Sequence, residues 1–170
     1  AHLKDVAPLL PGTKGNVIAT AHILGPLDNP KAELAIADGT LRYDRFTVTG
    51  LRSTIAASDL ASGPRAKIDL TARLNDLPLS LASNAAVNLG NGRISLDGIK
   101  LKLGGTTVTG TATLVGQGAD GALAFASTDL SELGKLLGQD LHGSAEGTLK
   151  LANAQDKQSA TLAAKLRSVN

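Results

Sequence analysis

Hydrophobic and polar residues alternate along much of the chain, the pattern of β-strands with one buried face. The clearest run is Arg65–Leu74, where Ala, Ile and Leu at even positions alternate with Arg, Lys, Asp and Thr at odd ones. Val108–Leu114 repeats the pattern with threonines on its polar side. Shorter runs of the same kind are Val17–Ile23, Lys31–Ile36, Leu77–Leu81, Ala85–Leu89 and Leu162–Arg167. The sequence therefore predicts an all-β protein.

Dipeptides that favour positive φ lie between these alternating segments. They predict tight hairpins at Asp38-Gly39, Asn91-Gly92, Asp97-Gly98 and Gly104-Gly105. Between Ala85 and Leu114 they indicate up to four short antiparallel strands. The apolar positions change from even to odd between Leu96 and Ile99. A hairpin at Asp97-Gly98 and a glycine bulge inside one long strand both account for this change.

Two segments depart from the alternation and predict short helices. Asp129 is the expected N-cap of the first, with Glu132 three residues on and Gly138 as its end. Its apolar stripe consists of Leu130, Leu133, Leu136 and Leu137. A weaker helix is expected over Leu3–Leu10, ended by Pro11-Gly12. The two segments align with each other, which indicates helix-strand repeat units starting near residues 3 and 129 within a single domain spanning 1–170.

Composition explains what kind of core the strands can build. Hydrophobic residues make up 42% of the 170 residues but aromatics only 2%, so a core packed with aromatic rings is excluded. The net charge is +2, which argues against a nucleic-acid partner. There is no cysteine and no apolar run of about 18 residues. The chain also lacks methionine, and we interpret it as an internal piece of a longer protein.

One apolar face per strand needs a cover, and the two short helices are too small to supply it. We therefore expect a curled, mainly antiparallel, U-shaped sheet (an open β-groove, or β-taco) with a hydrophobic concave interior. The residues expected to line it are Val17, Ile23, Leu34, Ile36, Ile68, Leu70, Leu74, Leu79, Val87, Leu89, Ile94, Leu101, Leu103, Val108, Leu114 and Phe125.

Residues for catalysis or metal binding do not form a recognisable pattern. The three histidines, His2, His22 and His142, lack the spacing of a metal site, and no P-loop or nucleophile-elbow motif occurs. Carboxylates such as Asp28, Asp38, Asp97 and Asp156 fall in expected turns and loops, where they favour turn formation. We expect a protein that is not an enzyme and that uses no cofactor and no metal.

Several segments combine leucines, glycines and prolines in similar ways: DLSEL at 129–133 followed by LLGQDLHG at 136–143 and TLKL at 148–151, VAPLLPG at 6–12, GPLDNPKA at 25–32, and IKLKLGGTTVTG at 99–110. These segments resemble the TamB family, the inner-membrane subunit of the translocation and assembly module, within the AsmA-like group. Neither an N-terminal membrane anchor nor the family's C-terminal domain can be recognised in the sequence.

This resemblance implies a periplasmic segment of a bridge between the two membranes of a Gram-negative envelope, in a parent protein anchored in the inner membrane. Phospholipid acyl chains would be the ligand, and outer-membrane protein assembly would involve an Omp85-type barrel partner. The residues leave three alternatives open: a structural or adhesive β-solenoid with a solid core, a surface-binding sheet using the threonines of 107–113, and a module that docks through an exposed strand edge.

Overall fold

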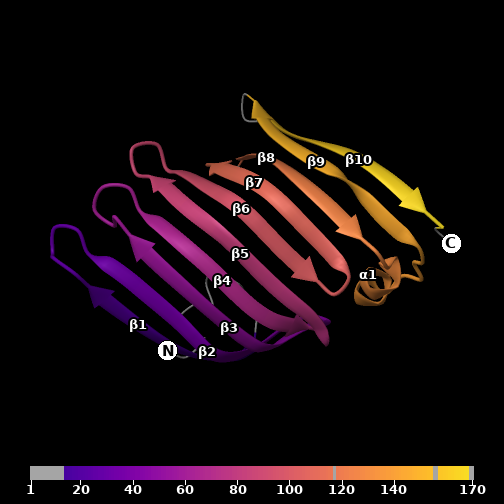
Figure 1. Ribbon diagram of the computed structural model, residues 1–170, viewed down its shortest axis with the longest axis horizontal. Helices are drawn as coiled ribbons and strands as arrows, with labels where there is room; N and C mark the ends of the chain where they lie inside the picture. Colours follow the sequence, from indigo (N-terminus) through magenta and orange to yellow (C-terminus); the bar gives the residue numbers. More distant parts are fainter. Residues whose placement is uncertain (1–13, 117, 155–156, 169–170) are drawn as a thin grey trace.

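The computed structural model describes residues 14–116, 118–154 and 157–168. Within these residues ten strands in chain order form one antiparallel sheet, and a single helix interrupts the series between β8 and β9 (Figure 1). The elements are β1 (Lys14–Leu24), β2 (Lys31–Tyr43), β3 (Phe46–Ser58), β4 (Arg65–Leu74), β5 (Leu77–Asn88), β6 (Arg93–Leu103), β7 (Thr106–Val115), β8 (Gly118–Ser127), α1 (Leu130–Leu137), β9 (Ser144–Ala154) and β10 (Lys157–Arg167). The predicted all-β, curled antiparallel sheet is confirmed.

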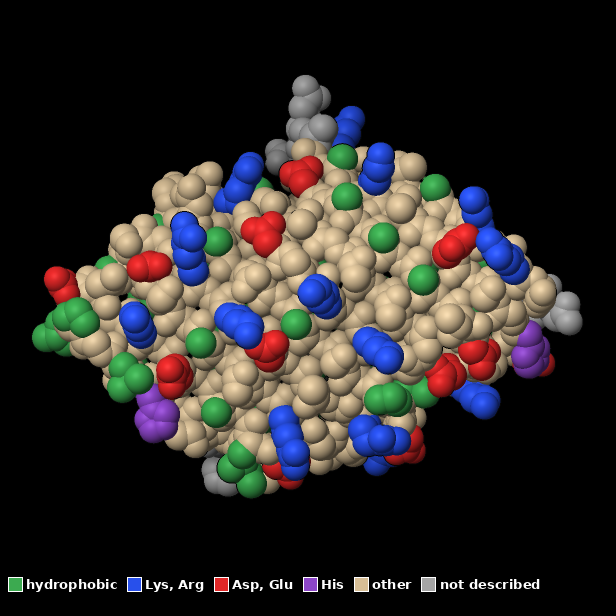
Figure 2. Space-filling model, in the orientation of Figure 1, with side chains coloured by type: hydrophobic (Ala, Val, Ile, Leu, Met, Phe, Trp, Pro, Cys, Tyr) green, Lys and Arg blue, Asp and Glu red, His purple; other side chains and the backbone are tan. Residues whose placement is uncertain are grey.

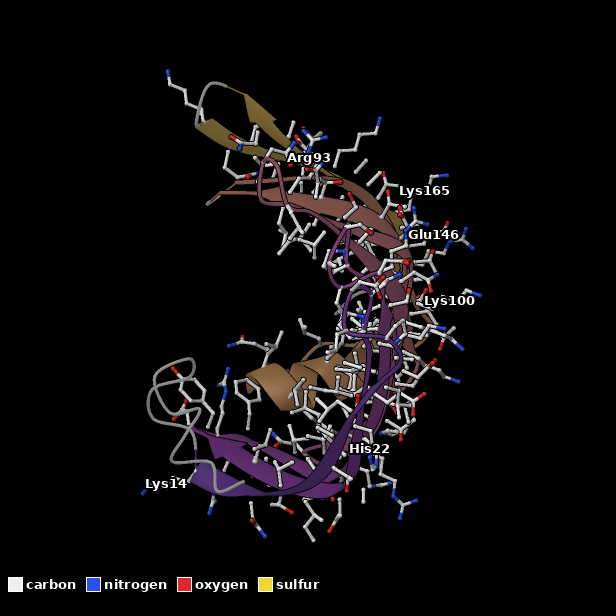
Figure 3. All side chains as sticks on the ribbon, turned by 90° about the vertical axis from the view of Figure 1, so that its left-hand side faces the viewer. Lys14, His22, Arg93, Lys100, Glu146 and Lys165 are labelled. Carbon is white, nitrogen blue, oxygen red and sulfur yellow. The ribbon has the colours of Figure 1, made fainter. Side chains whose placement is uncertain are left out.

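The sheet curls so that β1 and β10 form the two lips of an open trough (Figure 3). The register links one row of mostly apolar residues across all ten strands: Ala19, Ile36, Ser53, Leu70, Leu81, Leu101, Val108, Phe125, Gly147 and Ala164. We call this row, with the positions that alternate from it along each strand, the concave face. The intervening positions form the convex face, to which the labelled Lys100, Glu146 and Lys165 belong (Figure 3).

Irregularities in three strands keep the apolar residues on the concave face where the sequence alternation changes phase. In β6 the register shifts between Leu96 and Ile99, and Gly98 has a φ of 62°, so Asp97-Gly98 is a bulge inside one strand. Gly50, with a φ of 57°, has the same role in β3. Ala37 is the extra residue in β2. Each added residue shifts the apolar side chains from even to odd positions in the sequence, while they stay on the concave face of the sheet.

The hairpin predictions are therefore partly confirmed. Asn91-Gly92 and Gly104-Gly105 lie in turns between consecutive strands, as expected. Asp38-Gly39 was predicted wrongly, because both residues lie inside β2 next to its bulge.

Leu77–Leu81 and Ala85–Leu89 belong largely to one strand rather than two, since Ser83 fills a concave position between them. Its hydroxyl donates a 3.2 Å hydrogen bond to the Asp97 carbonyl in the bulge of β6, which makes a polar residue acceptable at that apolar position. Residues 85–114 accordingly contain the end of β5, all of β6 and most of β7, and not four short strands.

The turn at Asn75-Asp76 has no glycine and was not predicted. Both residues have positive φ, 44° and 68°, as in a type I′ hairpin. The Asn75 side chain compensates by accepting a 2.7 Å hydrogen bond from the Thr47 amide and donating a 3.2 Å bond to the Arg45 carbonyl. This turn therefore also ties β4 and β5 to the beginning of β3.

Replacing Asp76 with glycine should stabilise the protein, because glycine adopts a φ of 68° without the cost that aspartate bears. We expect Asp76→Gly to raise the free energy of unfolding by about 0.5–1 kcal/mol. The bond from Arg73 to the residue 76 carbonyl is unaffected, since it uses the backbone. Urea denaturation measures the change. An unchanged or lowered stability would mean that the Asp76 side chain contributes something the turn geometry does not account for.

Helix α1 forms where the sequence predicts it. Asp129 caps its N-terminus by accepting a 2.8 Å hydrogen bond from the Ser131 amide, and Gly138 ends it with a φ of 71°. This bond from Ser131 also lowers the pKa of the Asp129 carboxyl, so the charged cap persists above that pKa and is lost as pH falls through it. The other predicted helix, over Leu3–Leu10, and the repeat unit starting near residue 3 lie outside the described residues.

Candidate functional site

The concave face gathers the predicted lining residues from seven strands, β1, β2 and β4 to β8, onto one continuous surface. All of them except Leu89 occupy concave positions in the register. Leu89 was placed wrongly: it follows the end of β5, lies in the β5–β6 turn and is 58% exposed there. The register thus assembles, from strands more than 100 residues apart in the sequence, a surface that no single segment contains.

Some concave residues were missed in the sequence. Leu51 takes a concave position only because the Gly50 bulge shifts the phase of β3, and the sequence alone does not reveal that shift. Ile55, Leu123 and Leu149 also belong to the concave face. Their signal was present, since each alternates with residues of its own strand that point to the convex face.

Charge is segregated between the two faces of the sheet. Every Lys, Arg, Asp and Glu in the described strands falls on a convex position by register, and none falls on the concave face. Figure 2 views the convex side, where basic and acidic side chains are scattered over the surface. Two ion pairs there are Lys67–Asp69 at 3.3 Å and Arg167–Glu146 at 3.4 Å. The concave face is therefore uncharged across its whole width.

The few buried polar side chains of the concave face turn toward the protein rather than into the trough. The Ser53 hydroxyl donates to the Asp69 carbonyl at 3.0 Å, and Thr106 donates to Ser127 at 2.9 Å. Ser127 in turn donates to the Asp129 carbonyl at 3.1 Å. Among the described residues no buried side-chain polar atom lacks a partner. These hydroxyls offer no directional contact to a ligand, so the row that crosses the sheet attracts mainly through apolar contact.

The apolar concave face is not covered. Among the described residues, the buried apolar side chains are Leu51, Ala72 and Ala145, and no large side chain is fully buried. Ile23 is 78% and Leu162 65% exposed, near the two lips of the trough. The chain exposes 11276 Å², whereas a compact monomer of this mass exposes about 7,800 Å². An exposed apolar surface of this extent is typical of a binding site.

Glycines shape the floor of the trough by letting side chains of the next strand lie across them. A Cβ at Gly147 would come within 2.8 Å of the Phe125 ring, so the ring lies against the bare backbone of β9. A Cβ at Gly39 would come within 3.1 Å of the Leu51 Cβ. These contacts bring neighbouring strands together without a side chain between them, which suits a strongly curved sheet.

Helix α1 sits inside the trough near the turns of one end (Figure 3). The Glu132 carboxylate accepts a 2.6 Å hydrogen bond from the Gly105 amide in the β6–β7 turn. Glu132 therefore holds a neighbouring turn and does not only serve its own helix, as the sequence pattern implied. At the other end of the helix, a Cβ at Gly138 would lie 3.6 Å from the Arg45 guanidinium of the β2–β3 turn.

Removing the Glu132 carboxylate should loosen α1 without unfolding the sheet. The bond to the Gly105 amide is charge-assisted and part-buried, so its loss leaves a backbone donor unpaired. We expect amide exchange over residues 130–137 to accelerate on the order of ten-fold in Glu132→Ala. Glu132→Gln keeps an acceptor oxygen and serves as the control, with a smaller change. Equal exchange in all three proteins would show that apolar contacts alone hold the helix.

Other features of the described residues add no competing site. A shallow hollow of about 500 Å³ lies over β2–β6 and is open to solvent; its lining combines Ile36, Leu70 and Leu81 with Arg52, Asp69 and Lys100 and with smaller residues. No cluster of three or more His, Asp or Glu that could hold a metal occurs in the described part of the chain. No helix described is long and apolar enough to cross a membrane.

The fold and the face together define the class of this protein: an open, single-sheet β-groove whose strands present an uncharged, mainly apolar concave face. Comparisons with family models, curated proteins and solved structures find no match. The TamB resemblance therefore stays a prediction of the sequence.

Proposed function

We propose that the concave face shields phospholipid acyl chains from water, and that this chain is a segment of a bridge carrying lipid between the membranes of a Gram-negative envelope. The observation that supports the first part is the uncharged apolar surface that crosses all ten strands and stays exposed. The envelope setting, the support of outer-membrane protein assembly and the Omp85-type partner rest on the TamB resemblance. The proposal includes no catalysis.

The physical gain from such a surface is large. An acyl chain in water costs about 0.8 kcal/mol per CH₂, or roughly 12 kcal/mol for sixteen carbons. A strand of ten to thirteen residues is about 33–43 Å long. One leaflet of a bilayer contributes about 15 Å of hydrocarbon. The trough is thus long enough to cover a whole chain, while the open side leaves a polar headgroup in water.

Smoothness matters as much as affinity for a surface along which lipid moves. The row that crosses the sheet consists mainly of Ala, Ile, Leu and Val, with Ser53 turned toward the backbone. Such contacts are weak, numerous and without direction, so a chain can slide from one to the next. A pocket with a buried charge or a deep ring would instead hold one lipid in place.

Mass spectrometry of the purified protein under native conditions tests the proposal. We expect bound phospholipid, or uptake of an added fluorescent fatty acid when the protein has been stripped of lipid. The main alternative, a solenoid with a solid core, predicts neither. It is disfavoured by the short set of buried apolar side chains in the described residues. A folded protein that carries no lipid and takes up no fatty acid would contradict the proposal.

A further inference from the structure

The edge strand β1 carries exposed apolar side chains on both of its faces, although Lys14, Asn16, Thr20 and His22 share the convex one. Val17 and Ile23 lie on its concave side, and Ile18 and Leu24 on its convex side. Ile18 is 58% and Leu24 50% exposed, and Leu27 in the following turn is completely exposed. In the described structure β1 pairs with β2 alone. A long edge strand with apolar side chains on both faces is a template for pairing with another strand.

The opposite edge strand, β10, is protected in the way that soluble proteins protect such edges. Its convex side carries Lys157, Lys165 and Arg167. In β1 the corresponding side carries a single basic residue, Lys14, together with His22. Charged side chains, lysine above all, oppose the edge-to-edge association of sheets. The two edges of this sheet therefore differ, and β1 is the one suited to a partner.

We propose that β1 pairs antiparallel with β1 of a second copy of this chain, about a two-fold axis that passes beside Ala19. Ala19 is the middle residue of the eleven in β1, so this register pairs the whole strand. It sets Val17 opposite the partner's Ala21, and Gly15 opposite the partner's Ile23. Lys14 then lies opposite the partner's Leu24. No like charges meet in this register, in which Ile18 lies opposite the partner's Thr20 and Asn16 opposite the partner's His22.

Pairing β10 with β10 of a second copy in the equivalent register is unfavourable. Pairing β10 with its own copy about Leu162 would set Lys157 opposite the partner's Arg167, and it would do so twice because of the symmetry. Like charges directly opposite each other destabilise a strand pair. The charged residues of both edge strands therefore favour β1 over β10 as the strand that pairs with a second copy.

A two-fold axis normal to the sheet leaves both concave faces on the same side. The apolar surface of one copy then continues across β1 into that of the other. The dimer does not depend on lipid binding, since its contacts are strand edges and the side chains of β1 and its turn.

A single cysteine tests the proposed register directly, because the chain contains none. Residues directly opposite in antiparallel strands have Cβ atoms about 4.5–5.5 Å apart, close to the separation in a disulfide. Ala19→Cys should therefore form a disulfide-linked dimer rapidly under mild oxidation. Leu162→Cys, at the middle of β10, is the matched control and should stay largely monomeric. Equal or slower crosslinking of Ala19→Cys than of Leu162→Cys would overturn the proposal.

Sedimentation of the full chain over a range of concentrations tests the association itself. Leu24→Lys adds an ammonium opposite the partner's Lys14 at two places and should raise the dimer dissociation constant on the order of ten-fold. Leu166→Lys, the same change at a comparably exposed site in β10, should leave it unchanged. A monomer at all concentrations overturns the proposal. So does crosslinking of residues 1–13 to β1 within a monomer, which would identify the chain's own segment as the occupant.

Discussion

Leu101→Asp should reduce fatty-acid binding by ten-fold or more. Leu101 stands in the middle of the row that crosses the concave face, between Leu81 of β5 and Val108 of β7. A carboxylate there would have to lose water whenever an acyl chain covers it, and no basic side chain of the described strands shares that face. Titration with a fluorescent fatty acid measures the loss. Leu70→Asp, in the same row, should have a similar effect.

Thr109→Asp is the matched control for this change. Thr109 belongs to the convex face, directly opposite Lys100, and the substitution adds the same charge at a neighbouring position of the sheet. Binding should stay within about two-fold of the unchanged protein, because the added carboxylate is solvated and lies beside a lysine. Circular dichroism should report the same fold for both variants. Equal losses from Leu101→Asp and Thr109→Asp would show that the concave face is not the binding surface.

Gly110→Ala should lower the free energy of unfolding by about 2 kcal/mol or more. Gly110 has a φ of 151°, and a Cβ at this position would lie 2.1 Å from the Ala122 carbonyl oxygen. The obstacle is backbone of the next strand, so no side chain can move aside to make room. Either β7 and β8 separate locally or the bend at Gly110 is lost, and both outcomes weaken the curl of the sheet.

Thermal and urea denaturation measure this loss of stability, with Thr111→Ala as the control. Thr111 is the next residue, exposed on the convex face, and its replacement should change stability by no more than about 0.5 kcal/mol. A Gly110→Ala protein as stable as the original would mean that the close approach of β7 and β8 at this position is not required for the fold.

Alternation in the sequence was enough to predict the class of fold and the residues that share a face. It succeeded because most strands keep a two-residue period over long runs, as in β4, whose predicted bounds coincide with those observed. Helix α1 was equally predictable, since Asp129 and Gly138 mark its two ends.

The same alternation could not distinguish turns between strands from bulges inside a strand. A change of phase in the alternation has the same appearance whether the chain reverses or inserts one residue, so Asp38-Gly39 and Asp97-Gly98 look like Asn91-Gly92 in the sequence. The pairing with neighbouring strands decides between them. Conversely, Asn75-Asp76 reverses the chain without glycine because the Asn75 side chain binds the backbone of β3 and of the preceding turn.

The candidate site was predictable as a set of residues but not as a surface. The sequence identified Leu70, Leu101 and Phe125 as apolar positions in separate strands. Their placement in one row depends on the registers of all the strands between them. The complete segregation of charge also emerges only when the bulges are taken into account, since without them Asp97 and Lys100 would fall on opposite faces.

Position-resolved photocrosslinking tests the central claim most directly. A photoreactive amino acid is placed in turn at Leu70, Leu101 and Val108 on the concave face, and at their sequence neighbours Asp69, Lys100 and Thr109 on the convex face. With phospholipid supplied, our account predicts lipid adducts from the concave positions and none above background from the convex ones. Folded proteins that yield no lipid adduct from the concave positions, or equal adducts from both faces, would contradict it.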